Sequence, residues 1–429
     1  MHKTRETLIA SFALFSLFFG AGNLILPPLL GFKSGDQWWL VTLGFCISAV
    51  FFAILGVLAH AKLQGTMFDF AKKVSPTFSL VYSLLVYAIS ISLPSPRTAS
   101  VTHEMAIAPF FGTSSLLTSI VYFGLVFVFV MNRSKILDIL GKFLTPAIVL
   151  ILVMIIGITL FSSDFVFGAT EIAHPFSYAI LEGYQTFDAI GAVVVGGVII
   201  ISINLKNENA SYTEKRNLMK RMAWFSGLGL FLIYTGLILT GALLHNDFDS
   251  DISRTALLTG ISTQTLGNTA NLLLSILVAL ACFTTAVGIV TGTADFIQSR
   301  FGNAPLAYTL TGALGCALGV LMGQFQVAYI IAVALPALMF IYPITLVLIL
   351  LNVLPDRWAS PFVFKIVVAT TALFSVPDFL KSLNLNASTS LVTWLPLQEY
   401  HMGWVLPAIV AFVVCNVMIT LRKPQNQDI

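Results

Sequence analysis

Glycine and asparagine interrupt the first long apolar stretch of the chain. The segment reads Ser16-Leu-Phe-Phe-Gly20-Ala-Gly22-Asn23 and runs on to Pro27 and Pro28. Glycine weakens a helix, and the Asn23 amide needs hydrogen-bond partners at a depth where lipid offers none. Irregular backbone is tolerated there only where it is buried in protein or lines a cavity. The pattern predicts a broken helix with a binding site at the break, as in secondary transporters.

A second apolar stretch, residues 176–203, carries a similar interruption. Its middle runs from Gly183 through Gln185-Thr186-Phe187-Asp188 to Gly191. Asp188 is the one acidic residue that falls at the centre of a predicted span, and ionisable residues inside a membrane are usually functional. The alternative is a structural salt bridge, for which Arg97, also at membrane depth, is the candidate partner.

The two breaks offer complementary helix ends. The half-helix that starts near Gly22 and Asn23 presents N–H groups and a positive dipole end, which suit a carboxylate. The half-helices that end at the two breaks, one in each interrupted stretch, present carbonyl groups that suit an ammonium group or Na⁺. This combination matches a zwitterionic amino acid, although it would also serve another small polar solute. Thr284 and Thr285 add two hydroxyls, which either bond back to their own helix or bind a hard cation.

The composition is that of a polytopic membrane protein. Among its 429 residues 57% are hydrophobic and 10% are charged, and the mean hydropathy is +0.93, whereas soluble domains carry about 25% charged residues. Its four cysteines lie in apolar segments without metal-ligand spacing and are expected to be small buried hydrophobes. No Walker loop is present, which argues against ATP-driven transport by this chain alone. We expect no cofactor.

Hydropathy and charge together predict the topology. Stretches long enough to cross a bilayer of ~30 Å occur at residues 7–30, 38–60, 77–107, 115–131, 137–161, 176–203, 222–244, 267–293, 305–322, 326–351, 362–380 and 402–421. With the N-terminus in the cytoplasm, the outer loops hold only Lys33, Arg254 and Lys381, Arg97 lies within the membrane, and all other Lys and Arg face inward. This bias supports an even number of spans, about twelve, and two cytoplasmic termini.

The interrupted spans are the first and the sixth, five spans apart. Because five is odd, a repeated unit of five spans must be inverted, and corresponding breaks in two inverted repeats mark a transporter binding site. We expect an all-α membrane protein with a first repeat at residues 1–162, an inverted second repeat at 163–351, and two additional helices at 352–429.

These residues resemble those of a known family. The stretch Phe18-Phe-Gly20-Ala-Gly22-Asn23-Leu-Ile-Leu-Pro27-Pro28 and the tract Pro96-Arg97-Thr98-Ala99, with Glu104 following, are similar to motifs of the bacterial branched-chain amino acid:cation symporters, the system II carriers for leucine, isoleucine and valine. The resemblance extends over essentially the whole chain. It implies the five-plus-five inverted-repeat fold of the sodium-coupled leucine and neurotransmitter transporters.

The resemblance also implies site residues. For the substrate these are Gly20, Ala21, Gly22, Asn23, Thr186, Phe187, Asp188, Ala189, Ile190 and Gly191. For Na⁺ they are the carbonyl oxygens of Ser16, Phe19 and Ala281 with the hydroxyls of Thr284 and Thr285. The charges that we consider for coupling are Asp188, Arg97 and Glu104. The distant relatives carry a neutral hydroxyl near the position of Asp188, so Asp188 binds sodium, carries a proton or neutralises Arg97.

The expected function is therefore Na⁺-coupled import of leucine, isoleucine and valine by alternating access, in a bacterial inner membrane. Coupling to H⁺ or Li⁺ stays open, as does transport of another small amino acid or a nucleobase. An intramembrane enzyme would need a nucleophile–base pair or a metal cluster, and a channel would need a continuous polar stripe; the sequence favours neither. Besides substrate, ion and lipid we expect no partner: no nucleic acid and no obligatory protein.

Overall fold

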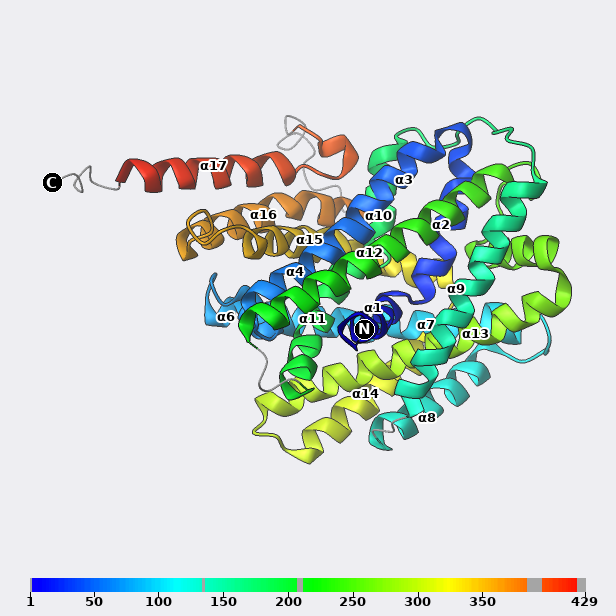
Figure 1. Ribbon diagram of the computed structural model, residues 1–429, viewed down its shortest axis with the longest axis horizontal. Helices are drawn as coiled ribbons and strands as arrows, with labels where there is room; N and C mark the ends of the chain where they lie inside the picture. Colours follow the sequence, from blue (N-terminus) through cyan, green and yellow to red (C-terminus); the bar gives the residue numbers. More distant parts are fainter. Residues whose placement is uncertain (1, 133–135, 207–210, 384–395, 423–429) are drawn as a thin grey trace. The chain divides into compact units, whose positions relative to one another are not determined.

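The computed structural model describes residues 2–132, 136–206, 211–383 and 396–422. Over these residues it consists of helices and connecting loops, with no strand (Figure 1). The chain forms two compact units: unit 1 comprises Met1–Val50, Tyr87–Phe187 and Arg221–Ala334, and unit 2 comprises Phe51–Val86, Asp188–Lys220 and Leu335–Ile429. The predicted division into inverted repeats concerns the chain topology and stays a prediction.

Unit 1 contains the first predicted break and the part of the second that ends at Phe187. Its elements are α1 (His2–Phe18), α2 (Ala21–Ser34), the short 3₁₀ helix η1 (Gly35–Gln37), α3 (Trp38–Cys46), α7 (Pro94–Thr102), the π-helical turn η3 (His103–Ile107), α8 (Ser115–Asn132), α9 (Ile136–Ser162), α10 (Pro175–Tyr184), α13 (Arg254–Arg300) and α14 (Pro305–Gly323). Four of the described elements are divided between the two units: α6 (Pro76–Ser92), α12 (Tyr212–Leu243), α15 (Val327–Val353) and the π-helical turn η2 (Ile47–Phe51).

Local sequence explains where several of these helices begin and end. Pro175 and Pro305 stand at the first turns of α10 and α14, where the missing N–H costs nothing. The Ser253 hydroxyl caps α13 by accepting the Ala256 N–H at 3.2 Å. Within α13, Gly267 has φ 79° and ψ 175° and separates the first turns from the long apolar part. The eighth predicted span, which starts at residue 267, therefore begins at a real break in the helix.

Helix α13 is the centre of packing in unit 1. It contacts α2, α7, α8, α9 and α14, and Figure 1 shows its long yellow-green ribbon close to α14 and α8. Buried apolar side chains from α7, α8, α13 and α14 form one core, which includes Phe123, Val126, Val287 and Val290. Because α13 packs on α2, and α2 begins directly after the first break, α13 lies beside that break.

Unit 2 contains α4 (Phe52–Leu63), α5 (Met67–Ala71), α11 (Asp188–Lys206), α16 (Pro361–Ser382), the 3₁₀ turn η5 (Gln398–Tyr400) and α17 (Val405–Arg422). Helix α11 packs on α4 and α5, and α16 packs on α17. His60 of α4 is fully buried, and its ring nitrogens lie 2.8 Å from the Val193 carbonyl oxygen and 3.1 Å from that of Gly65. His60 thus helps to hold α4 against α11.

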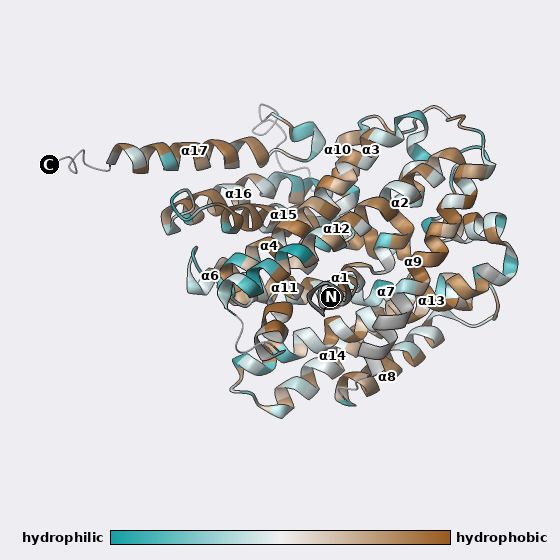
Figure 2. Ribbon diagram, viewed as in Figure 1, coloured by the Kyte–Doolittle hydropathy of each residue, from teal (hydrophilic) through white to brown (hydrophobic). Residues whose placement is uncertain are grey.

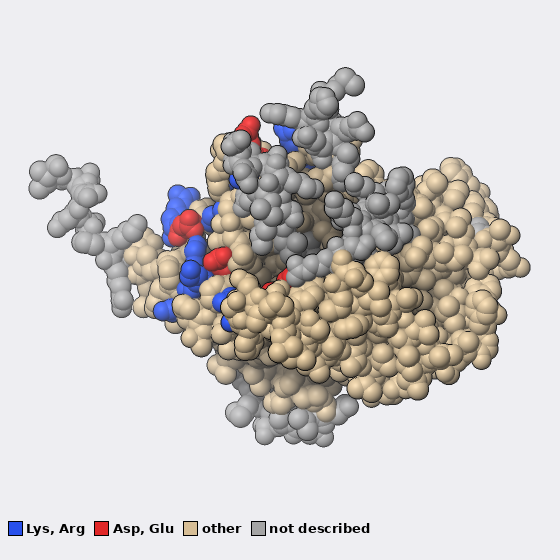
Figure 3. Space-filling model, turned by 90° about the horizontal axis from the view of Figure 1, so that it is seen from below, with Lys and Arg blue, Asp and Glu red and all other residues tan. Residues whose placement is uncertain are grey.

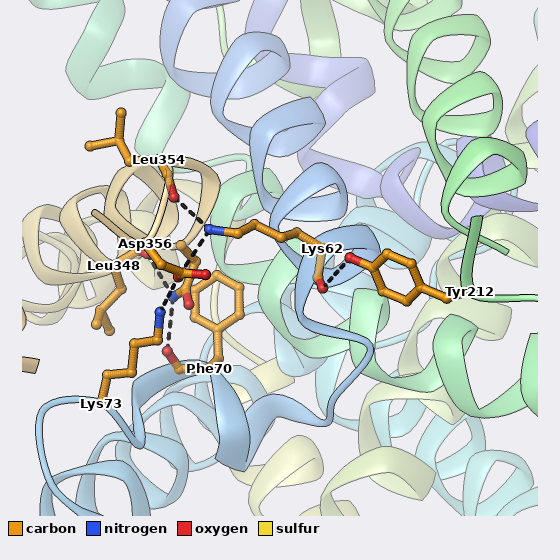
Figure 4. A network of polar contacts seen from close by, with 8 residues as sticks. Lys62, Phe70, Lys73, Tyr212, Leu348, Leu354 and Asp356 are labelled. Carbon is orange, nitrogen blue, oxygen red and sulfur yellow. Dashed lines mark hydrogen bonds and ion pairs between the residues drawn. The ribbon is translucent and has the colours of Figure 1, made fainter. Parts of the chain in front are cut away.

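A polar network also connects α4, α5 and the α15–α16 loop in unit 2 (Figure 4). The Asp356 carboxylate lies 2.8 Å from Lys73 Nζ and 3.3 Å from Lys62 Nζ. Lys62 also donates to the Leu354 carbonyl oxygen at 2.5 Å, and its own carbonyl accepts the Tyr212 hydroxyl at 3.0 Å. The ammonium group of Lys73, which donates to this carboxylate, holds the pKa of Asp356 below its usual range, and Lys62 acts in the same direction.

The helices and their surface are those of a multi-pass membrane protein. Within the described residues, eight helices are long and apolar enough to cross a membrane, and Pro146–Ser162 and Val405–Leu421 are shorter apolar helices. Brown, hydrophobic stretches occur on most of the helices in Figure 2. Large apolar side chains such as Leu314 on α14 and Leu373 on α16 are exposed. The face in Figure 3 has a wide area without charged residues. The number of spans, about twelve, stays a prediction.

The four cysteines are buried and unpaired by disulfides, which confirms that they serve as small apolar residues. The third predicted span, residues 77–107, is interrupted in the structure. Helix α6 ends at Ser92 and α7 begins at Pro94, with Leu93 at φ −122° and ψ −67° between them. Every residue of α7 is buried, so this interruption delivers a polar tract, including Arg97, into the interior of unit 1.

Candidate functional site

The first break lies where the sequence predicts it. Helix α1 ends at Phe18 and α2 begins at Ala21, and Gly20 between them is extended, with φ −108° and ψ −171°. The Gly20 N–H donates to the Phe18 carbonyl oxygen at 2.9 Å, and the Asn23 N–H donates to the Gly20 carbonyl oxygen at 3.2 Å. The break therefore ends one helix and starts another, and each such terminus carries backbone groups without a helical partner of their own.

Asn23 is 1% exposed and its side chain has a defined partner. The amide nitrogen donates to the hydroxyl of Tyr234 on α12. The Tyr234 ring in turn packs against Phe19, at 6.5 Å between ring centroids, and against Phe45, at 5.3 Å. Asn23 thus anchors the first turn of α2 to α12, which satisfies a polar group that the sequence places at membrane depth.

The second break also lies at the predicted position. Helix α10 ends at Tyr184, and Phe187 adopts φ 63°, a left-handed conformation that is uncommon for a residue with a bulky side chain. The N–H groups of Gln185, Thr186 and Phe187 bond to carbonyls three residues back, at 3.0, 3.2 and 3.1 Å. These tight turns end the helix, and Thr186 and Phe187 are buried.

Arg97 contacts residues at both breaks. Its Nη1 donates to the Gln185 carbonyl oxygen at 2.8 Å, at the end of α10, and its guanidinium lies 5.7 Å from the centroid of the Phe187 ring. A Cβ atom on Gly22 would lie 2.5 Å from Arg97 Nη2. Arg97 is 5% exposed. A buried positive charge therefore sits at the start of α2 and at the end of α10, both in unit 1.

Thr284 and Thr285 lie on α13 beside the first break. Both hydroxyls donate to the Ala281 carbonyl oxygen at 2.9 Å, so the structure shows the back-bonded arrangement that the sequence left open. A Cβ atom on Gly20 would lie 3.7 Å from Thr285 Oγ1. A back-bonded hydroxyl still has lone pairs that can accept a bond or a cation. The Na⁺ ligand set with the carbonyls of Ser16 and Phe19 stays a prediction.

The remaining predicted substrate residues belong to unit 2. Asp188 is 2% exposed and stands in the first turn of α11, where a carboxylate is favoured by the helix dipole. The Ala189 N–H donates to the Tyr342 hydroxyl at 3.3 Å, and Ala189 and Ile190 are buried. Because Arg97 belongs to unit 1, the predicted pairing of Arg97 with Asp188 stays a prediction.

One polar cluster near the second break was not predicted. Arg254, the first residue of α13, bonds Glu182 of α10 through both carboxylate oxygens, at 3.2 and 3.1 Å. Gln185 joins the cluster, because its side-chain amide donates to Glu182 at 3.2 Å and its amide oxygen lies 3.4 Å from Arg254 Nη1. The sequence held a signal for it, since Arg254 is one of the few cations in the predicted outer loops.

Glu104, a predicted coupling residue, has structural partners. Its Oε2 accepts the Thr255 hydroxyl at 2.6 Å, and its Oε1 accepts the N–H of Val327 at the start of α15 at 2.9 Å. The carboxylate thereby caps α15 and ties it to the first turn of α13. These contacts explain Glu104 without a role in ion coupling, which stays a prediction.

Comparisons with known proteins agree with this architecture. Residues 3–422 match the family described as branched-chain amino acid transport protein. The branched-chain amino acid transport system 2 carrier protein of Pseudomonas aeruginosa is 30% identical over 440 residues, which cover 99% of this chain and 98% of that protein. The branched-chain amino acid permease BraB of Bacillus subtilis is 30% identical over 436 residues, 99% and 97% of the two chains.

Solved structures show the fold. The inward-facing conformation of Mhp1 aligns with a TM-score of 0.63 at 14% identity, covering 96% of this chain and 91% of that one. MhsT in complex with L-phenylalanine aligns with a TM-score of 0.52 at 16% identity, covering 96% and 98%. The curated relatives are carriers and permeases, not enzymes. With the two broken helices at the predicted positions and a match over nearly its whole length, the chain belongs to the branched-chain amino acid transport protein family.

Proposed function

We propose that this protein imports leucine, isoleucine and valine together with Na⁺ by alternating access. The observation that carries the proposal is the geometry at the first break, in a chain that belongs to a branched-chain amino acid transport family. There α1 ends and α2 begins within two residues, Phe19 and Gly20, so helix ends of opposite polarity lie close together. A zwitterion is the solute that such a pair of ends binds well.

The two ends would bind the two charged groups of the substrate. The first N–H groups of α2 suit its carboxylate, and the last carbonyls of α1 and α10 suit its ammonium group. Phe19 and Phe187 are buried beside these ends and would provide apolar surface for an aliphatic side chain. A missing methylene costs only ~1–3 kcal/mol in such a pocket, so the three branched-chain amino acids should compete within a modest range.

Na⁺ would bind between α1 and α13. The proximity of Thr285 to Gly20 supports this location, because the hydroxyl oxygens of α13 lie beside the end of α1. Oxygen ligands suit a hard cation. Bound Na⁺ would then hold the first break against α13 and raise the affinity for substrate, and substrate would raise the affinity for Na⁺. Coupling to H⁺ through Asp188 is the alternative.

The membrane and the orientation are part of the same proposal. The Lys and Arg bias of the predicted loops supports two cytoplasmic termini. The relatives from Pseudomonas aeruginosa and Bacillus subtilis support a bacterial plasma membrane, the inner membrane in a bacterium with two membranes.

Uptake into proteoliposomes tests the proposal. Radiolabelled leucine is presented under an imposed Na⁺ gradient or an imposed pH gradient, each without the other. We expect uptake with the Na⁺ gradient, competition by excess isoleucine and valine, and none by lysine or uracil. Uptake that follows the pH gradient and ignores Na⁺ would move the coupling to a proton. Competition by lysine or uracil, with none by valine, would contradict the substrate.

A further inference from the structure

Arg97 is held in a defined position by two contacts that do not involve the start of α2. Nη1 donates to the Gln185 carbonyl oxygen at 2.8 Å, and the guanidinium lies 5.7 Å from the Phe187 ring centroid. The helix that carries Arg97, α7, is buried along its whole length. A side chain fixed in this way loses little further freedom when it binds a ligand, so binding costs it less.

The other side of the guanidinium faces the first break. A Cβ atom on Gly22 would lie 2.5 Å from Nη2 and 3.1 Å from Cζ, so the absence of a side chain at this residue is what allows Arg97 to reach the first turn of α2. The N–H groups of that turn are the groups to which the proposed function assigns the substrate carboxylate. Two independent positive features, a helix start and a buried guanidinium, thus meet at one point of unit 1.

We propose that Arg97 is a direct ligand of the substrate carboxylate and sets the specificity for amino acids over their uncharged derivatives. This inference rests on the proposed function, since it names a further residue of the same site. Nη2 would donate to one carboxylate oxygen while N–H groups of α2 bind the carboxylate as well. A guanidinium is suited to this because its donors are planar and it stays charged.

A purely structural role for Arg97 makes a different prediction. If Arg97 only braces the end of α10 through Gln185, its replacement would weaken the binding of every ligand by a similar factor. If Arg97 binds the carboxylate, its replacement would weaken leucine and leave leucinamide nearly unaffected, because leucinamide keeps the ammonium group and side chain but has no carboxylate. The ratio of the two affinities therefore separates the roles, whatever happens to overall stability.

The experiment measures binding of leucine and leucinamide to the purified full-length protein in Na⁺ buffer, by displacement of radiolabelled valine. A hydrogen bond between charged groups is worth ~1.5–3 kcal/mol, a factor of roughly 10 to 100 in affinity. The wild type should prefer leucine by about that factor. Arg97→Gln should reduce the preference to within a few fold, chiefly by weakening leucine, and Arg97→Lys should keep part of it.

Arg254→Gln is the matched control, because Arg254 is also an arginine bonded to the end of α10, through the side chains of Glu182 and Gln185. Its preference for leucine should equal that of the wild type. An Arg97→Gln protein that keeps the full preference, or loses affinity for both ligands alike, overturns the inference. If Arg97→Gln does not fold, Arg97→Lys replaces it: a preference below that of the wild type supports the inference, and an unchanged preference overturns it. Wild-type protein that binds no branched-chain amino acid contradicts the proposed function itself, and this inference with it.

Discussion

Replacing Gly22 by alanine tests the contact between Arg97 and the first break. The added Cβ would lie 2.5 Å from Nη2, and comfortable contacts between such atoms begin at about 3.5 Å, so the guanidinium must recede by about 1 Å. A movement of that size is enough to break the 2.8 Å bond from Nη1 to the Gln185 carbonyl. That loss costs ~1.5–3 kcal/mol, offset by up to ~1 kcal/mol from the better helix propensity of alanine.

The net effect expected is a loss of roughly 0.5–3 kcal/mol in the free energy of unfolding. Leucine affinity should fall as well, because the displaced guanidinium no longer sits where the substrate carboxylate would bind. Gly20→Ala is the internal comparison. Its Cβ would lie 3.7 Å from the nearest atom, Thr285 Oγ1, and the Gly20 backbone is extended, a conformation that alanine adopts freely. Gly20→Ala should therefore fold as the wild type does, and any change that it causes reports on ligand space beside Thr285.

The assay is thermal unfolding of each purified variant together with its leucine affinity. Gly288→Ala on α13 provides the control for helix propensity, because among the described residues the added Cβ would meet no atom within 4 Å apart from its own stretch of helix. Gly22→Ala should be less stable than Gly288→Ala and bind leucine more weakly. The reasoning is refuted if the two variants unfold at the same temperature and bind leucine equally.

Further expectations concern ions and pH. Thr285→Ala should raise the Na⁺ concentration needed for half-maximal leucine uptake, because it removes the hydroxyl that is the proposed ligand. Thr285→Ser keeps a hydroxyl and should need about as much Na⁺ as the wild type. If both variants need the same Na⁺ concentration, the proposed site is contradicted. Asp188→Asn should impair uptake strongly, since the residue is 2% exposed, and uptake at the wild-type rate would contradict a coupling role. The Lys73 ammonium lowers the pKa of Asp356. The ion pair therefore stabilises the fold fully above about pH 4, and this contribution is lost on further acidification. Between pH 7 and pH 3 the unfolding temperature of Asp356→Asn should fall less than that of the wild type, and an equal fall would contradict the assignment. Because Asp356 is 72% exposed, that effect should be small.

The elements and the breaks could be predicted because their signals are local. Apolar length predicts where helices lie, and Gly20 with Gly22 predicts where one of them ends. The second break was predicted from the same kind of signal, although its sharpest feature, the positive φ of Phe187, is not visible in the sequence. A left-handed phenylalanine arises from the tertiary setting, because no intrinsic preference of this residue favours it.

The contacts between distant segments could not be predicted. The sequence placed Asn23 at a depth where it needs a partner, yet nothing in it points to Tyr234 as that partner. Thr284 and Thr285 were predicted to lie beside the first break, and Thr285 does lie near Gly20. Whether their hydroxyls would bond to Ala281 could not be decided beforehand, since a threonine in a helix can turn its hydroxyl inward or outward at little cost.

Both arginines at the end of α10 are cations that the charge rule for loops did not explain. Arg97 was placed within the membrane and Arg254 in an outer loop, against the bias of nearly all other Lys and Arg. In the structure one bonds the Gln185 carbonyl and the other bonds the Glu182 carboxylate. A charge kept at an unfavourable depth or on the unfavourable side needs a local partner that offsets its cost. Such exceptions therefore locate the polar interior of a transporter more sharply than the apolar pattern does, and here they indicate the end of α10, where a helix stops inside the protein.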